Sequence, residues 1–233
     1  MHKIARIALL ISFFGTPLFA GFFPQTVHTS IKSVDGKNIT LKQNFPINGM
    51  SGAVIHNYGD GLSAITSRIT QTSTKGEAIL LDADVIDHEA LPSIKTSVSP
   101  KDRVIGGYLY NNILLLAPDA NTYAKITSSR QKKWIHPDLF AVYLSVLGDN
   151  RPTKENLASF AKKFQIGLIY IVRKNRAILL DPISGTIVGE KKMSGLPKKG
   201  QFPFYMRIKA PESGWFGGSS DTTGNYYNTM QSI

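Results

Sequence analysis

Apolar and polar residues alternate along the first half of the chain, from Thr26 to about Thr127. Two of the alternating runs, 27–31 and 39–41, lie on either side of Asp35-Gly36. Glycine tolerates the positive φ that a tight turn requires, and strand side chains alternate between two faces. The spacing therefore predicts a β-hairpin at the start of this region.

A second pair of runs, 50–57 and 62–70, is joined through Gly59-Asp60-Gly61 and predicts another hairpin. Further strands are expected at 77–85, 94–98, 103–109, 113–116 and 123–127. Many short strands separated by Gly, Pro and Asn are typical of a small barrel or sandwich.

The hydrophobic period changes after the basic residues Arg130, Lys132 and Lys133. Pro137 suits a first helical turn, and apolar residues then recur at helical spacing until Gly148. Thr153 is a good N-cap for a second helix, which we expect to end near Phe164. Strands are predicted at 166–172 and 177–180, and a third at 186–189.

These patterns predict an α+β protein in which a small all-β barrel or sandwich precedes a compact helix-helix-strand-strand unit. The expected divisions are 1–20 (signal peptide), 21–130 (β-rich domain), 131–193 (α+β domain) and 194–233 (basic segment and flexible tail). Because the period changes close to Trp134, we expect the two folded regions to have separate cores. Gly, Ser, Thr, Asn and Tyr dominate 213–233, which predicts a mobile tail.

The N-terminus has the order of a secretory signal peptide. His2, Lys3 and Arg6 precede the apolar run 7–14, and cleavage is expected after Ala20. A membrane anchor is the alternative, but the apolar run is shorter than the ~20 residues that a bilayer span needs. We therefore expect an exported bacterial protein of the periplasm or cell surface, without a transmembrane segment in the mature chain.

Composition narrows the function classes. Hydrophobic residues make up 42% of the 233 residues and charged residues 18%, which excludes full disorder and a coiled coil. The chain has no cysteine, which excludes disulfides, cysteine-based metal centres and a catalytic thiolate. No phosphate-binding loop, nucleophile elbow or dinucleotide fingerprint occurs, so we expect no enzymatic activity and no cofactor.

One acidic cluster is the best candidate for a metal site. It contains Asp82, Asp84, Asp87, His88 and Glu89. Hard cations need several converging oxygen ligands, but this spacing lacks the glycine of a calcium loop. Solvated carboxylates at a strand end are the alternative, and no metal site is predicted.

The net charge of +11 lies mainly in the second half of the chain. Basic groups occur at Arg130/Lys132/Lys133, Arg173/Lys174/Arg176, Lys191/Lys192 and Lys198/Lys199. They predict either an anionic partner, such as an envelope surface or an acidic protein, or a solvated basic face. No aromatic and basic residues interleave as in a nucleic-acid motif, so nucleic acid is not an expected partner. Lys191, Lys192, Lys198 and Lys199 are the candidate partner-binding residues.

Several motifs resemble a known family. They are Trp134-Ile135-His136-Pro137-Asp138-Leu139-Phe140, Gly148-Asp149, Pro152-Thr153-Lys154-Glu155, Gln165-Ile166-Gly167-Leu168-Ile169-Tyr170, Leu180-Asp181-Pro182-Ile183-Ser184 and, after the signal peptide, Gly21-Phe22-Phe23-Pro24. Together they resemble the N-terminal domain family of the bacterial plasminogen-binding protein PgbA. The resemblance covers the chain to about Met193. It implies an envelope or surface protein that binds host plasminogen, whose kringles recognise lysine.

Two functions follow as alternatives. The first is a non-enzymatic binding protein whose exposed lysines engage plasminogen. The second is a periplasmic structural or scaffold component of an envelope machine such as the flagellar motor, with an envelope-complex protein as its partner.

Overall fold

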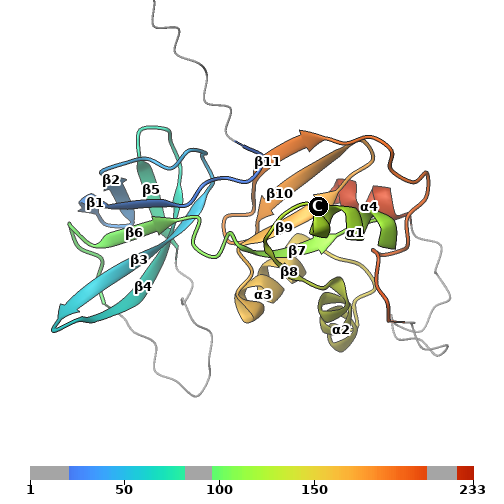
Figure 1. Cartoon of the computed structure of the whole chain (residues 1–233). Coiled ribbons are helices and arrows are strands. Elements are labelled where there is room, and N and C mark those ends of the chain that lie inside the picture. Colours follow the sequence, from blue (N-terminus) through green and yellow to red (C-terminus); the bar gives the residue numbers. More distant parts are fainter. Residues whose placement is uncertain (1–20, 82–95, 209–224) are drawn as a thin grey trace, which may run out of the picture.

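The computed structural model describes residues 21–81, 96–208 and 225–233. Within these residues six antiparallel strands close into a barrel, in the order β1-β2-β5-β4-β3-β6 (Figure 1). They are β1 (Val27–Asp35), β2 (Asn38–Leu41), β3 (Ser51–Gly59), β4 (Leu62–Gln71), β5 (Glu77–Leu81) and β6 (Arg103–Gly106). Pairing of β1 with β6 closes the barrel, with Val27 opposite Gly106. The predicted small barrel and both predicted hairpins are confirmed.

A second sheet of five strands lies beside the barrel in the described chain, in the order β11-β10-β9-β7-β8 (Figure 1). Its strands are β7 (Asn112–Leu116), β8 (Lys133–Ile135), β9 (Leu168–Val172), β10 (Arg176–Asp181) and β11 (Thr186–Lys192). β7 is parallel to both β8 and β9, and the β9-β10-β11 pairings are antiparallel. The carboxyl ends of β7, β9 and β11 therefore lie at one edge of this sheet.

Four helices belong to this second lobe in the described chain: α1 (Ala120–Ser128), α2 (Pro137–Leu147), α3 (Lys154–Phe164) and α4 (Tyr226–Ser232). Both predicted helices, α2 and α3, are confirmed. His136 caps α2 by accepting the N–H of Asp138, and Gly148 ends it with a φ of 75°. The Thr153 hydroxyl accepts the N–H of Asn156 at the start of α3, as the sequence indicated.

Two predicted strands are wrong. Residues 123–127 belong to α1, because the Asp119 carboxylate accepts the N–H of Thr122 and starts a helix there. Residues 96–98 form no strand, and 94–95 lie outside the described residues. The predicted strand 113–116 is confirmed, but it pairs in the second sheet as β7 rather than in the barrel.

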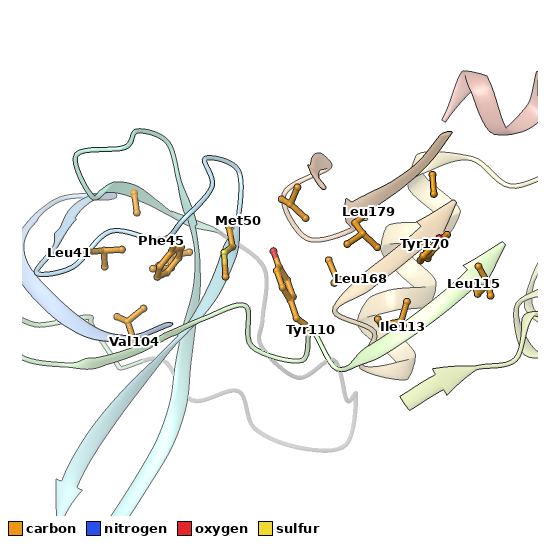
Figure 2. Packing of buried hydrophobic residues seen from close by; sticks show 14 of the residues in the cluster. Leu41, Phe45, Met50, Val104, Tyr110, Ile113, Leu115, Leu168, Tyr170 and Leu179 are labelled. Carbon is orange, nitrogen blue, oxygen red and sulfur yellow. The ribbon is translucent and has the colours of Figure 1, made fainter. Parts of the chain in front are cut away.

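The expectation of separate cores is also wrong. One continuous apolar cluster fills the barrel and covers the facing side of the second sheet. Figure 2 shows Met50 and Tyr110 between barrel residues such as Phe45 and sheet residues such as Leu168. The period of hydrophobicity identified the elements. It could not show that the end of the barrel next to the second sheet is apolar and is closed by that sheet.

A second apolar cluster covers the opposite face of the sheet under α2, α3 and α4. The alternate residues Ile169 and Ile171 of β9 point into it, whereas Leu168, Tyr170 and Val172 point into the first cluster. Burial on both faces explains why β9 is a continuous apolar run. No helix in the described parts of the chain is long and apolar enough to cross a membrane.

The end of the predicted mobile tail is ordered instead. Tyr226 of α4 is buried, and its hydroxyl lies 2.9 Å from the carbonyl oxygen of Leu116 and 2.7 Å from that of Val172. These carbonyls lie at the carboxyl ends of β7 and β9, so α4 covers the edge where those strands end. The rest of the predicted tail, 213–224, lies outside the described residues.

Candidate binding surface

The four candidate lysines lie along the edge of the sheet where β7, β9 and β11 end. Lys192 is the last residue of β11, opposite Arg176 of β10. Lys198 and Lys199 follow in a loop that is fixed at both ends, because Tyr227 donates to the carbonyl of Pro197 and the N–H of Gln201 donates to that of Pro118. Three strand spacings separate β11 from β7, roughly 15 Å. The exposed lysines therefore share one edge of the sheet.

Lys191 and Lys192 face opposite sides of the sheet, because neighbouring side chains of a strand alternate. Lys191 lies on the face that is directed towards the barrel, opposite Ala177 in the register. Its ammonium lies 4.6 Å from the ring centre of Phe22 and 5.4 Å from that of Tyr170. Lys192 points to the other side, so a pair in the sequence becomes two separate groups in space.

The segment that precedes the barrel lies on this same face of the sheet. Phe22 and Phe23 contact one another and both contact Tyr170, with ring centres 5.0 to 6.3 Å apart. Trp134 of β8 adds a fourth ring, 6.2 Å from Tyr170. Gly189 of β11 permits the close approach, because a Cβ there would overlap the carbonyl oxygen of Phe22. We call Phe22–Pro24 the strap.

One more cation, Lys132, reaches the strap from the opposite edge of the sheet. The Lys132 ammonium lies 5.2 Å from the ring centre of Phe23 and donates to the side-chain oxygen of Asn111 at 2.7 Å. The Arg130 backbone is fixed beside it, because the Trp134 indole donates to the Arg130 carbonyl at 3.2 Å. Burial is the main cause that lowers the pKa of both Lys132 and Lys191, and the positive charge of Arg130 lowers both further.

A buried carboxylate joins the two lobes. Asp181, at the end of β10, is fully buried. One of its oxygens accepts the N–H of Ser51 at 2.8 Å and the hydroxyl of Tyr110 at 2.6 Å. The other accepts the N–H groups of Ile183 and Ser184 at 2.8 and 3.2 Å. Burial, followed by the charge of Asp181, raises the pKa of Tyr110 well above its usual value, so the phenol stays a donor.

A small pocket opens beside this junction, between the outer wall of the barrel on one side and α3 and the loops of the second lobe on the other. Ala53, Leu109, Ile166 and Ile183 give it apolar walls, and Arg68 supplies one guanidinium. Burial lowers the pKa of Arg68, while the negative charge of Asp181 opposes that shift. The charges of Arg68 and Asp181 thus act on one another across this junction.

The structure places the candidate catalytic and metal residues as follows. His56 and Asp102 form a hydrogen bond of 2.9 Å, and Asp102 also accepts from the N–H and hydroxyl of Ser99. His136 serves as a helix cap. In the part of the chain that the structure describes, no three His, Asp or Glu side chains converge as metal ligands. The acidic cluster at 82–89 lies outside the described residues.

Comparison with known proteins adds a family to this geometry. The family model described as plasminogen-binding protein pgbA N-terminal matches residues 26–233, most of the chain. The chain belongs to this family. No curated protein and no solved structure matches it.

The match to the PgbA N-terminal family spans the barrel, the second sheet and α4. It includes all four candidate lysines as well as Arg130 and Lys132, whereas the strap precedes the matched range. Sequence reasoning singled out these cations as separate basic groups and Phe22-Phe23 as part of a motif. It missed that Lys191 contacts Phe22 and that Lys132 contacts Phe23, because these contacts depend on how the strap packs across the sheet.

Proposed function

We propose that this chain is an exported, non-enzymatic binding protein of the bacterial cell envelope that binds host plasminogen through exposed lysines. The observation that carries the proposal is the placement of Lys192, Lys198 and Lys199, all exposed, along one edge of the sheet in a member of the PgbA N-terminal family. Lys191 completes the proposed set from the opposite face of β11.

The four lysines differ in how far their ammonium groups are accessible to a partner. A kringle pocket must surround a lysine ammonium, and the loop that carries Lys198 and Lys199 presents both side chains to solvent. The Lys191 ammonium is covered on one side by the rings of Phe22 and Tyr170. We therefore propose that Lys192, Lys198 and Lys199 make the main contacts and that Lys191 contributes less.

The direct test measures binding to immobilised plasminogen. In the variant K191A/K192A/K198A/K199A we expect the affinity to fall by at least about tenfold, equivalent to ~1.4 kcal/mol. The control K32A/K42A/K75A/K125A removes the same charge from exposed lysines elsewhere in the fold. Exposed substitutions usually change stability by no more than about 0.5 kcal/mol, so both variants should fold.

Competition identifies the mechanism. Free 6-aminohexanoate, a lysine analogue, should abolish binding at constant ionic strength if kringles recognise these lysines. Added salt should weaken a purely electrostatic contact instead, because the Debye length is only ~8 Å at physiological ionic strength. Equal binding by the four-lysine variant and its control would remove these lysines from the mechanism.

The second candidate is a periplasmic scaffold component. The observation that favours it is the junction, because a shared core and the Asp181 network fix the barrel against the sheet. Location separates the two candidates. Protease treatment of intact cells should degrade a surface protein and spare a periplasmic one, and the N-terminal sequence of the envelope fraction should begin at Gly21 in both cases.

A further inference from the structure

The second sheet ends in a free edge at β11. The strand order places β8 and β11 at its two edges, and Figure 1 shows β11 on the outside with no strand of the described chain beyond it. β11 has seven residues and β8 only three, so β11 is the longer edge. An edge strand presents N–H and C=O groups to which a further strand can add.

The register of β10 and β11 shows which backbone groups face outwards. The N–H of Met193 donates to the carbonyl of Asn175 at 2.9 Å, so these two residues form a hydrogen-bonded pair just beyond the last pair of the strands. Hydrogen-bonded and non-hydrogen-bonded pairs alternate along antiparallel strands. Lys191 therefore bonds β10, whereas the N–H and C=O groups of Glu190 and Lys192 point away from it. No backbone hydrogen bond of the described loops uses these outward groups.

Positive charge surrounds this part of the edge. Lys191 and Lys192 are exposed, Arg176 lies opposite Lys192, and Lys174 lies in the turn that joins β9 to β10. The only carboxylate among residues 174–176 and 189–193 is Glu190, which the Arg176 guanidinium contacts at 3.3 Å. Four cations and one carboxylate leave a net positive charge beside the outward backbone groups.

We propose that β11 is the docking edge for an extended acidic segment of a partner protein, which adds to the second sheet as a further strand. The outward backbone groups of Glu190 and Lys192 supply the hydrogen bonds of strand addition, and the cations attract the acidic side chains of the segment. Two copies of this edge would each bring a net positive charge, which disfavours pairing of β11 with a second copy. The contact uses backbone groups, so it is distinct from the proposed insertion of lysine side chains into plasminogen kringles.

The first experiment compares two synthetic peptides that differ only in charge. Fluorescently labelled EVTVEVE and KVTVKVK, with both ends blocked, are titrated with the natural protein and followed by fluorescence anisotropy. We expect the acidic peptide to bind at least about tenfold more tightly than the basic one, because the edge repels the second peptide. Equal binding of the two, or no binding of the acidic peptide, would overturn the proposal.

A proline at position 190 tests whether the backbone of the edge makes the contact. E190P removes an outward N–H without removing a hydrogen bond to β10, and edge strands tolerate proline where the N–H faces outwards. The control E190Q loses the same carboxylate and keeps the N–H. The affinity for EVTVEVE should be at least about tenfold lower in E190P than in E190Q, and equal affinities would contradict strand addition. Both variants should bind immobilised plasminogen as the natural protein does, so this result and that of the proposed function are read separately.

Amide hydrogen exchange of the natural protein gives a second measurement if E190P folds poorly. Saturating EVTVEVE should slow exchange at Glu190 and Lys192 by at least about tenfold and change Lys191 far less, because Lys191 is already bonded to β10. Equal slowing at all three amides, or none, would refute pairing at this edge. Sedimentation should show a monomer without the peptide. A dimer that E190P abolishes would assign the edge to a second copy and overturn the acidic partner.

Discussion

Replacing Asp181 by Asn tests the junction between the two lobes with minimal change of shape. Each carboxylate oxygen accepts two donors, so whichever oxygen becomes an NH2 group then faces two donors. Two hydrogen bonds to a charged acceptor are lost, at about 1.5–3 kcal/mol each. The half-buried Arg68 loses the negative charge beside it at the same time. We expect D181N to lower the free energy of unfolding by about 3–6 kcal/mol, the sum of these two hydrogen bonds.

Urea-induced unfolding followed by far-ultraviolet circular dichroism measures this loss. The control Y110F removes one donor and leaves the other three, so it should cost about 1.5–3 kcal/mol. The double variant D181N/Y110F should cost less than the sum of the single variants, because both substitutions act on the same network. A loss of under about 1 kcal/mol in D181N, the range of exposed ion pairs, would refute the assignment of Asp181 as the link between the lobes.

Two further predictions concern the strap and the start of α2. Gly189→Ala places a methyl group against the carbonyl of Phe22, so it should lower the free energy of unfolding by about 1–3 kcal/mol. It should also speed amide hydrogen exchange at residues 22–23. Gly21→Ala is the matched control, because a Cβ at Gly21 would have no neighbour within 4 Å. Burial lowers the pKa of His136 below 6.5, and the cap requires the unprotonated ring. As the pH falls from 6.5 towards the lowered folded-state pKa, the unfolded chain takes up the proton first, so the melting temperature should fall in that window. His136→Asn keeps a cap acceptor and should make this part of the profile flatter.

The sequence predicts the elements well where local chemistry decides them. Asp35-Gly36 marks the first hairpin, and Thr153 and Gly148 mark helix ends as expected. The strand predicted at 123–127 fails because Thr, Tyr and Ile favour strands by propensity. Tyr123 and Ile126 are in fact three residues apart on one helix face, and Asp119 is the cap that signals the helix.

Contacts between distant segments are beyond local patterns. The sequence predicts that Asp181 is a turn residue, yet its carboxylate accepts the N–H of Ser51, which is 130 residues away in the chain. A carboxylate that directly follows a buried apolar strand was the available signal. The contact of Lys191 with Phe22 is similar, because it depends on the strap crossing the face of the sheet beside β11. The four candidate lysines remain a prediction that awaits the binding experiment.

Asp181 is synthesised well after the last strand of the barrel that it stabilises. Synthesis delivers a chain from its N-terminus, and all six barrel strands have been made once Gly106 has emerged. The N–H of Ser51 and the hydroxyl of Tyr110 must then wait for an acceptor that is made only at residue 181. Met50 likewise waits for the apolar face of β9 and β10. The nascent barrel therefore passes through a period in which its apolar end is exposed to water. A chaperone that binds apolar surface would bind the chain best during that period.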